Sequence, residues 1–393
     1  MKLNPNILKV TPKNLGFNFC VFGDPTQEIM DWINHWKLKY EKVSGFTNIF
    51  INDKNINEIF DVRDPYEYID GFSPNLNKHL HLGHLSNLIF AKSLQKLGLG
   101  KKFIAILGDT ISGSVDKNDA LKKYKEYINK FNYSVDDIYF ASEQKLNNSS
   151  MLEDGTGEYI GTKVFNTGNG YVVGIKSSGH TTYFYQDVAL AEKLGKTTLY
   201  VTGIEQKNHF NLLSNMYNHI DHVGLGLVTV NGKKMSSSDG NVIFAENVID
   251  MIVEKFNGNE KLAWNVISGY ILKYDPSSVK NIDIKSIDNV KTSLGLYLSY
   301  TLAKMKSAGM NINSTNIKEF NSNALKFKLI KSKVNLSPNI LFEELVNHTK
   351  EISKLYVSHT IKDNVKNQKM FQPLVDDLML GMNLLGMFDI DKV

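Results

Sequence analysis

Residues 67–98, EYIDGFSPNLNKHLHLGHLSNLIFAKSLQKLG, decide the fold of this protein. EYIDGF at 67–72 predicts a strand that runs into a turn. From Gly83 to Gly98 the apolar residues recur at helical spacing, on one face that carries Leu85, Ile89, Leu94 and Leu97. KFIAILGD at 102–109 then predicts a second, buried strand. A strand, a helix and a strand in this order begin a parallel sheet.

The rest of the chain predicts one α/β domain followed by an all-α domain. Further strands are expected at 171–176, 181–187, 198–203 and 224–230, with a helix at 208–220 between the last two. This alternation predicts an open, doubly wound parallel sheet of the Rossmann type over residues 61–275, with an insertion at about 118–170. Long helical periodicity predicts a helical bundle at 276–393, and residues 1–60 are expected to form an N-terminal appendage.

Composition excludes several classes of protein. The chain of 393 residues has 42% hydrophobic and 22% charged residues, which is typical of a globular protein. Cys20 is the only cysteine, so an internal disulfide and a thiolate-rich zinc site are excluded, and we expect no zinc. The net charge of +4 permits a polyanionic partner without indicating one. No apolar run is long enough to cross a membrane and no signal core is present, so we expect a cytoplasmic protein.

Three histidines, His79, His81 and His84, stand between the first strand and the first helix. As metal ligands they would need an acidic partner, and the turn does not place them on one helical face. As ordinary histidines they would pack or face solvent. His81 and His84 flank Gly83 at a helix start, where free N–H groups and the positive end of the helix dipole attract anions. A phosphate site is therefore the sharper hypothesis.

Two motifs resemble the signatures of class I aminoacyl-tRNA synthetases. His81-Leu82-Gly83-His84 resembles the HIGH signature of that class. Lys234-Met235-Ser236-Ser237-Ser238 resembles the second signature, KMSKS, and lies about 150 residues later, after a predicted strand. Both motifs thus stand in the order and the local context of the class.

Within the class, the chain resembles the arginyl-tRNA synthetases. Their segment SPNxxKxxHxGH is matched by Ser73, Pro74, Asn75, Lys78, His81, Gly83 and His84. TTYFYQDVALAEKL, YVTGIEQKNHF, YLSYTLAKMKSAG and LVDDLMLGMNLLGMF resemble later segments of that family. The resemblance spans about residues 65–393. It implies activation of arginine by ATP to arginyl-AMP, transfer to tRNA, and an anticodon-binding role for the helical domain.

The resemblance implies how ATP is held. His81 and His84 would donate to phosphate oxygens, and Gly83 would let the backbone approach the nucleotide. Ser237 stands where the usual loop has a second lysine, and Lys78, just before the first signature, would replace it. Lys78 and Lys234 would hold the triphosphate with a Mg²⁺ ion that the nucleotide carries, whereas single lysines are more often surface residues. The other implied nucleotide-binding residues are Gly203, His209, Met235, Ser236 and Ser238.

The resemblance also implies an arginine pocket. Tyr183 and Asp187 would hold the guanidinium, since a carboxylate pairs with it in bidentate geometry. The other end of the amino acid would be held by Asp70, Ser73, Asn75 and Gln206. Tyr183 and Asp187 could instead be a packing residue and a helix cap. Asp70 stands where relatives usually have glutamate, so a related amino acid is compatible with the pocket. Asp109 matches a family residue at the end of a strand.

Two other functions remain open from the sequence. One is a synthetase paralogue that activates an amino acid but transfers it to an acceptor other than tRNA. The other is a non-catalytic, tRNA-binding descendant of a synthetase. The partners implied for the first function are ATP, arginine or a related amino acid, and tRNA, with no resident metal and no membrane. The family is mostly monomeric, so a monomer is expected.

Overall fold

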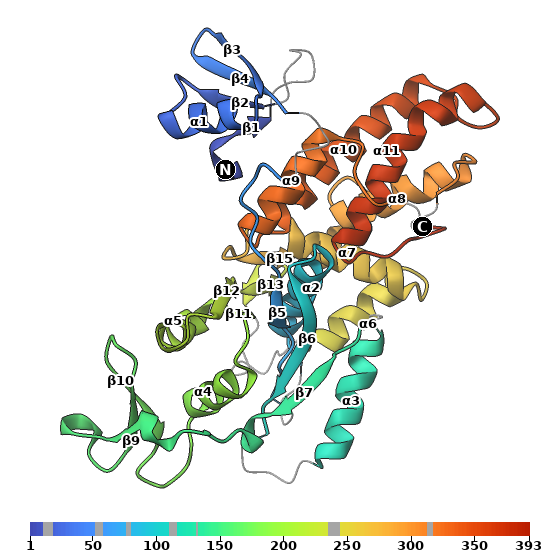
Figure 1. Ribbon diagram of the computed structural model, residues 1–393. Helices are drawn as coiled ribbons and strands as arrows, with labels where there is room; N and C mark the ends of the chain where they lie inside the picture. The colour runs from blue at the N-terminus through green and yellow to red at the C-terminus, as the bar shows by residue number, and fades with distance from the viewer. Residues whose placement is uncertain are drawn as a thin grey trace. The chain divides into compact units, whose positions relative to one another are not determined.

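The computed structural model describes residues 1–10, 19–51, 58–75, 80–109, 116–130, 133–234, 244–312 and 317–393 (Figure 1). The chain divides into two compact units. One unit is Pro65–Thr292, and the other combines Met1–Asp64 with Ser293–Val393. The N-terminal residues therefore fold together with the C-terminal helices, from which they are far removed in sequence.

The unit Pro65–Thr292 is built on a five-stranded sheet whose neighbouring strands are all parallel. The strands are β5 (Tyr66–Asp70), β6 (Gly100–Leu107), β7 (Asp137–Phe140), β11 (Thr198–Gly203) and β12 (Ile220–Leu225). Their order across the sheet is β12-β11-β5-β6-β7. The chain therefore builds outward from β5 in one direction, returns, and builds in the other. This confirms the predicted doubly wound, Rossmann-type fold.

Helix α2 (Leu82–Lys96) connects β5 to β6, as the opening stretch predicts. Its apolar residues Leu85, Leu88 and Ile89 are buried. The helix lies so close to the start of the turn that a Cβ atom on Gly71 would clash with Ala91. α2 ends before Gly98, whose φ of +81° is a conformation that glycine adopts without strain. Close packing at Gly71 thus fixes α2 against the end of β5, and Gly98 ends the helix before β6.

The structure corrects the interpretation of residues 118–170 as an insertion. α3 (Lys117–Lys130) and β7 from this range continue the central α/β layer, and β7 is an edge strand of the main sheet. Only the later part forms a separate antiparallel sheet, from β8 (Leu152–Asp154), β9 (Lys163–Asn166) and β10 (Tyr171–Ile175). The strand expected at 171–176 is therefore present but lies outside the main sheet.

The strand predicted at 181–187 is wrong, because the helix α4 (Tyr183–Leu194) begins there. Thr182 is its N-cap, and its side-chain oxygen accepts a hydrogen bond from the Tyr185 N–H at 3.3 Å. The helix expected at 208–220 is α5 (Lys207–Met216), which ends four residues earlier and leaves room for β12.

The strand predicted at 224–230 is divided. β12 ends at Leu225, and β13 (Val228–Val230) joins another sheet with β14 (Lys233–Lys234) and β15 (Lys280–Ile282). The break falls at Gly226, where a Cβ atom would clash with the backbone of Ser278. Helices α6 (Ala245–Lys255) and α7 (Glu260–Leu272) complete this unit.

The C-terminal part of the second unit is helical, as predicted, but it begins at Ser293, because residues 276–292 belong to the α/β unit. Its helices are α8 (Leu294–Ser307), α9 (Asn323–Val334), α10 (Asn339–Ser358) and α11 (Val365–Leu384). Asp377 on α11 is buried, and its carboxylate accepts hydrogen bonds from the backbone N–H groups of Asn321 at 2.6 Å and Ser322 at 2.8 Å. A buried side chain of α11 thus fixes the start of α9.

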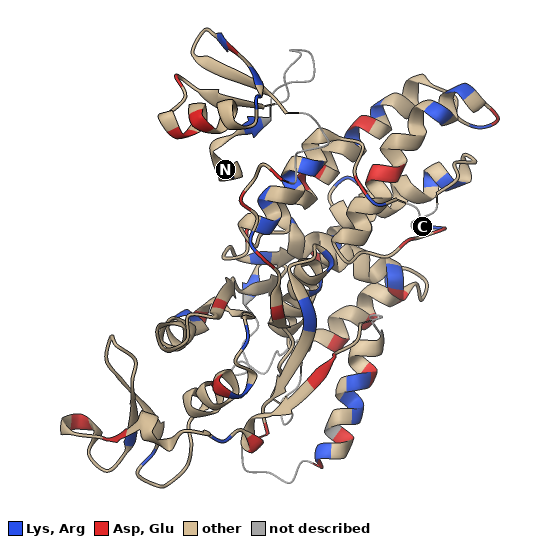
Figure 2. Cartoon of the chain, in the orientation of Figure 1, with Lys and Arg blue, Asp and Glu red and all other residues tan. Residues whose placement is uncertain are grey.

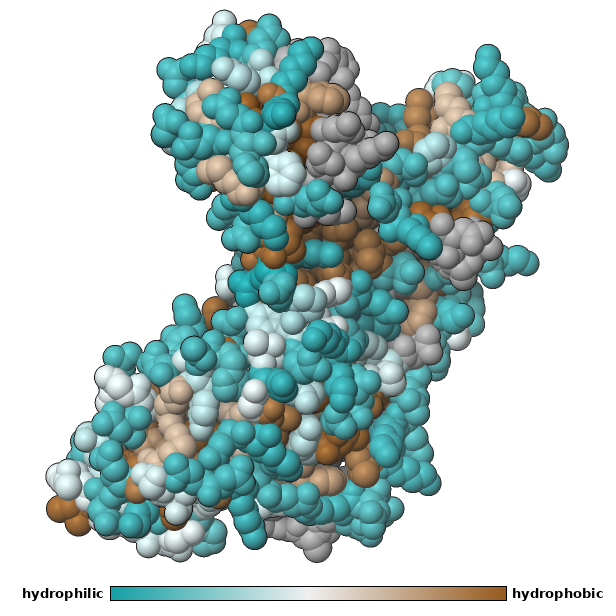
Figure 3. Space-filling view, viewed as in Figure 1, coloured by the Kyte–Doolittle hydropathy of each residue, from teal (hydrophilic) through white to brown (hydrophobic). Residues whose placement is uncertain are grey.

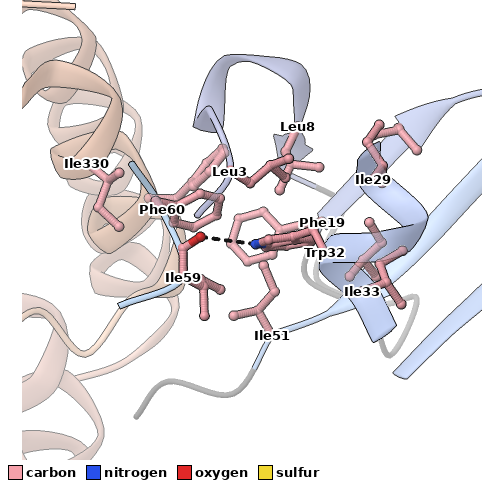
Figure 4. Close-up of a cluster of buried hydrophobic side chains, with 13 residues drawn as sticks. Leu3, Leu8, Phe19, Ile29, Trp32, Ile33, Ile51, Ile59, Phe60 and Ile330 are labelled. Atoms are coloured by element: carbon pink, nitrogen blue, oxygen red, sulfur yellow. Dashed lines mark hydrogen bonds between the residues drawn. The ribbon is translucent and has the colours of Figure 1, made fainter. Parts of the chain in front are cut away.

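Residues 1–60 form a small α/β subdomain in this unit. β1 (Lys9–Val10), β2 (Phe19–Phe22), β4 (Phe46–Phe50) and β3 (Lys39–Val43) lie in this order in an antiparallel sheet, and α1 (Gln27–His35) packs with it. Figure 4 shows that the core of the subdomain includes Ile330 of α9, and Phe327 belongs to the same cluster. Trp32 donates from Nε1 to the carbonyl of Ile59 at 3.0 Å inside this core.

None of the helices in the described ranges is both long and apolar enough to cross a membrane. The face of the protein in Figure 3 is mostly hydrophilic.

Candidate active site

The strand order reverses between β5 and β11, and this is where open α/β sheets bind their ligands, at the carboxyl ends of the strands. Asp70 is the last residue of β5 and lies beside Tyr200 of β11, which is its partner in the register. Gly203 ends β11, and α2 begins at Leu82. Three predicted features of the site therefore lie near the carboxyl ends of these strands: Asp70, Gly203 and the N-terminus of α2.

Asp70 is a buried carboxyl group. Ser73 donates a hydrogen bond from Oγ to Oδ1 of Asp70 and accepts one from the Ile106 N–H at 2.7 Å, which ties both residues to β6. Burial raises the pKa of Asp70 to about 7, the Asp187 charge adds to the rise, and bonds from Ser73 and the Phe72 backbone oppose it. Asp70 therefore changes its charge near neutral pH, and a bound cation would favour the charged form.

His81 and His84 meet at the start of α2. His81 is the N-cap residue, and the two rings are stacked with centroids 3.7 Å apart. The His81 N–H donates to Nδ1 of His84 at 3.3 Å. A Cβ atom on Gly83 would lie 2.9 Å from the His81 ring, so glycine is needed here for the histidine pair itself. Two imidazoles and the N–H groups of the first helical turn thus lie together at the positive end of α2.

Asp187 and His209 form a pair that the sequence did not predict. Oδ2 of Asp187, on α4, lies 2.6 Å from Nε2 of His209, on α5. The rings of Phe184 and Phe210 lie edge-on to His209, at 5.2 and 5.1 Å between centroids. The residues assigned to the guanidinium and to ATP are therefore in direct contact.

Tyr200 is a buried residue beside Asp70 that neither motif predicts. It is 1% exposed, and its hydroxyl has no hydrogen-bond partner within the part of the chain that the structure describes. Burial, and then the charges of Asp187 and Asp70, raise the pKa of Tyr200 well above its usual 10, so the hydroxyl keeps its proton. A sequence signal for Tyr200 exists only if β5 and β11 are predicted to be parallel neighbours. Tyr200 then pairs with Asp70 across the two strands.

His222 on β12 pairs with Tyr200 from the opposite side to Asp70, because β11 lies between β5 and β12. Burial, and then the charges of His209 and Lys207, lower the pKa of His222 to about 4, so the ring is neutral at physiological pH. Nε2 of His222 lies 2.9 Å from Oγ1 of Thr202. His222 therefore adds a polar group but no charge beside the strand ends.

Two other residues predicted for the amino-acid pocket, Tyr183 and Gln206, are exposed. Tyr183 is 54% exposed at the first position of α4, one turn before Asp187, and Gln206 is exposed in the turn after β11. Asn75 forms a bridge with Gly108 at the end of β6. The Glu205 carboxylate lies where a Cβ atom on residue 203 would be, so glycine leaves room for this side chain.

Asp109, the family match at the end of β6, forms a second polar cluster at the same sheet edge. Its Oδ2 lies 2.6 Å from Nζ of Lys117, and its Oδ1 accepts from the Ser142 N–H at 2.8 Å. Burial alone would raise the pKa of Asp109, but its bonds to Lys117 and Ser142 lower it overall. The carboxylate is thus charged and held between the ends of β6 and β7.

Several predicted residues cannot be placed. Lys78, His79, Met235, Ser236, Ser237 and Ser238 lie outside the described residues. The backbone of Lys234 ends β14 and pairs with Thr229. In the described ranges, no three His, Cys, Asp or Glu side chains are grouped as a metal site would require.

Arginine–tRNA ligases are found both among proteins of similar sequence and among solved structures of similar fold. No protein family model matches the chain. The arginine–tRNA ligase of Oenococcus oeni is 29% identical over 259 residues, which are 54% of this chain and 45% of that protein. The match spans about half the length of such curated relatives.

Two solved structures share the fold. The arginyl-tRNA synthetase of Thermus thermophilus has a TM-score of 0.67 at 13% identity, covering 98% of this chain and 96% of that chain. The arginyl-tRNA synthetase of Plasmodium falciparum has a TM-score of 0.65 at 17% identity, covering 98% and 95%. The predicted resemblance to the class I arginyl-tRNA synthetases is thus confirmed.

Proposed function

We propose that this protein activates arginine with ATP, forming arginyl-AMP and pyrophosphate, and transfers the arginyl group to tRNA. One observation carries the proposal: two acidic residues, Asp70 and Asp187, lie at the switch point of the sheet, and the histidine pair lies at the N-terminus of α2, the helix that follows β5. Acidic groups suit a cationic amino acid, and the helix start suits a phosphate. The reaction joins a carboxylate of the first ligand to the α-phosphate of the second.

For the amino acid, Asp187 binds the guanidinium and Asp70 binds the α-ammonium. A carboxylate has two oxygens with several acceptor positions, so Asp187 can keep His209 on Oδ2 and still accept guanidinium N–H groups. Ser73 holds the Asp70 carboxyl in place. Asn75, Tyr183 and Gln206 complete the rim of the pocket.

For ATP, the role of the protein is to position the phosphates and to stabilise the charge that develops as pyrophosphate leaves. His81 and His84 donate to phosphate oxygens at the start of α2. Lys78 and Lys234 bind the triphosphate, with Met235, Ser236 and Ser238 beside it, and Gly203 and His209 contact the nucleotide from β11 and α5. Mg²⁺ arrives with ATP and offsets the negative charge of the phosphates.

For tRNA, the helical domain at 276–393 takes the anticodon-binding role. Figure 2 shows basic residues along α3. Its exposed lysines, which would bind a phosphate backbone, include Lys117, Lys122, Lys123 and Lys125. Lysine contacts of this kind predict that tRNA affinity falls as the salt concentration rises.

The test measures exchange of labelled pyrophosphate into ATP with each of the twenty amino acids, with and without tRNA, followed by tRNA charging. We expect exchange with arginine alone among the twenty, and arginyl-tRNA in the second assay. Exchange without charging of any tRNA would point to the paralogue with another acceptor. Binding of tRNA without binding of ATP or any amino acid would point to the non-catalytic descendant.

Asp187→Ala and Asp154→Ala are a matched pair for these assays. Both residues are acidic and paired in the structure, but Asp154 is exposed, on β8, with Lys163 at 2.8 Å. The proposal requires that only Asp187→Ala abolish arginine-dependent exchange. If Asp187→Ala exchanged as the parent does, the pocket assignment would be wrong.

A further inference from the structure

The hydroxyl of Tyr200 is a buried polar group that the folded protein does not satisfy within the described residues. Buried hydroxyls usually have a hydrogen-bond partner, because leaving one unpaired destabilises the protein. The Tyr200 ring itself is well packed, with its centroid 4.7 Å from that of Phe210. Packing therefore explains why residue 200 is aromatic, but it does not explain why the ring carries a hydroxyl group.

The surroundings of the hydroxyl are acidic. Tyr200 and Asp70 are partners on neighbouring strands, and paired residues of parallel strands point to the same face of the sheet. Asp187 is near enough to both for its charge to act on each of them. These three residues come from β11, β5 and α4, at the carboxyl end of the sheet. A protonated phenol near these carboxyl groups can both donate and accept a hydrogen bond.

We propose that Tyr200 is a recognition residue for the cationic amino acid, whose N–H groups supply the hydrogen-bond partner that the Tyr200 hydroxyl lacks. The inference rests on the proposed function, because it takes the ligand to be the amino acid that Asp70 and Asp187 bind. The phenolic oxygen accepts an N–H of the ligand. Tyr200 thereby adds an acceptor to those of Asp70 and Asp187, which suits a guanidinium with its five N–H donors better than an ammonium with three.

Tyr200→Phe tests this inference because it removes the hydroxyl and keeps the packed ring. We expect arginine to bind about tenfold more weakly by titration calorimetry, as for the loss of a hydrogen bond to a charged group. ATP affinity should stay the same, and thermal stability should stay equal or rise, because an unpaired buried hydroxyl is removed.

Tyr133→Phe is the matched control. Tyr133 is also a buried tyrosine of this unit, but its hydroxyl donates to Oε1 of Gln95 at 2.6 Å. Tyr133→Phe should lose thermal stability and keep the arginine affinity. Tyr200→Phe should instead lose arginine affinity and keep its thermal stability.

Equal arginine affinity for the parent and Tyr200→Phe would overturn the role of Tyr200 and leave the proposed function intact. Failure of the parent to bind arginine would overturn both. Arginine binding by the parent without pyrophosphate exchange would overturn the activation step, and the comparison of affinities would still decide the role of Tyr200.

Discussion

The carboxylate of Asp187 lies 2.6 Å from Nε2 of His209, across the two helices α4 and α5. Asp187 is proposed for the amino acid and His209 for the nucleotide, so the contact connects two ligand sites that the sequence treats separately. Asp187 also acts on the pKa of Asp70 through its charge. For a substitution at any of these residues, the affinities for arginine and for ATP should therefore both be measured.

Asp187→Asn should weaken arginine binding about 30-fold or more. The amide has the same size and can still accept from His209, but it cannot make the charge-assisted bonds that contribute roughly 2–3 kcal/mol to binding a cation. Titration calorimetry with arginine measures the loss, and the KM for ATP should change less than about threefold. Asp154→Asn, on the exposed β8 strand, should behave as the parent. Equal losses of ATP and arginine affinity in Asp187→Asn would contradict separate roles.

Arginine binding should strengthen as pH rises from 6 to 8. The pKa of Asp70 is about 7 in the protein without ligand, and only the charged carboxylate pairs with a cation. The fraction of charged Asp70 rises about tenfold over this range, so the Kd for arginine should fall about tenfold and then level above pH 8. Asp70→Asn should bind weakly at each pH and lose this dependence. If Asp70→Asn kept the pH dependence of arginine binding, another titrating group would be its cause.

Local patterns in the sequence predict the first part of the fold well. The β5–α2–β6 unit follows from a strand pattern, a helical apolar face and glycines, all within residues 67–109. β7 was missed because it is a four-residue edge strand with half-buried side chains, so it has no apolar run to reveal it. The aromatic alternation at 181–187 suggested a strand, but Thr182 caps a helix there, and capping decides where a helix begins.

The site was only partly predictable for a similar reason. Asp70 and His81 could be placed at the ends of a strand and at the start of a helix from local sequence alone. The Asp187–His209 contact joins residues 22 positions apart, and the Tyr200–Asp70 register joins two strands that are separated by most of the unit. Contacts of this kind depend on how the strands pair, which composition and periodicity do not specify.

Asp70 should also make the protein less stable as the pH rises. The pKa of an aspartate is about 3.9 in an unfolded chain and that of Asp70 is about 7 in the folded one, so the folded state binds more protons between these values. Its contribution is fully present below about pH 4 and is lost as the pH rises through 7, by up to about 4 kcal/mol. Urea unfolding followed by circular dichroism should therefore show Asp70→Asn to be more stable than the parent at pH 8 and similar to it at pH 4. A constant difference between the two proteins at both pH values would argue against a raised pKa.

Phe327→Ala on α9 should destabilise the N-terminal subdomain. The Phe327 ring is buried, with its centroid 4.5 Å from that of Phe19 and 5.5 Å from that of Phe60, so truncation leaves a cavity between α9 and the strands. Phenylalanine-to-alanine changes in cores lower the free energy of unfolding by roughly 3–5 kcal/mol. Trp32, in the same cluster, should then report the loss through a shift of its fluorescence to longer wavelength. Phe50→Ala is the control, because Phe50 is 44% exposed and should change stability by less than about 1 kcal/mol. If Phe327→Ala unfolded at the same urea concentration as Phe50→Ala, residues 1–60 would fold without support from α9, and the shared core would have no energetic role.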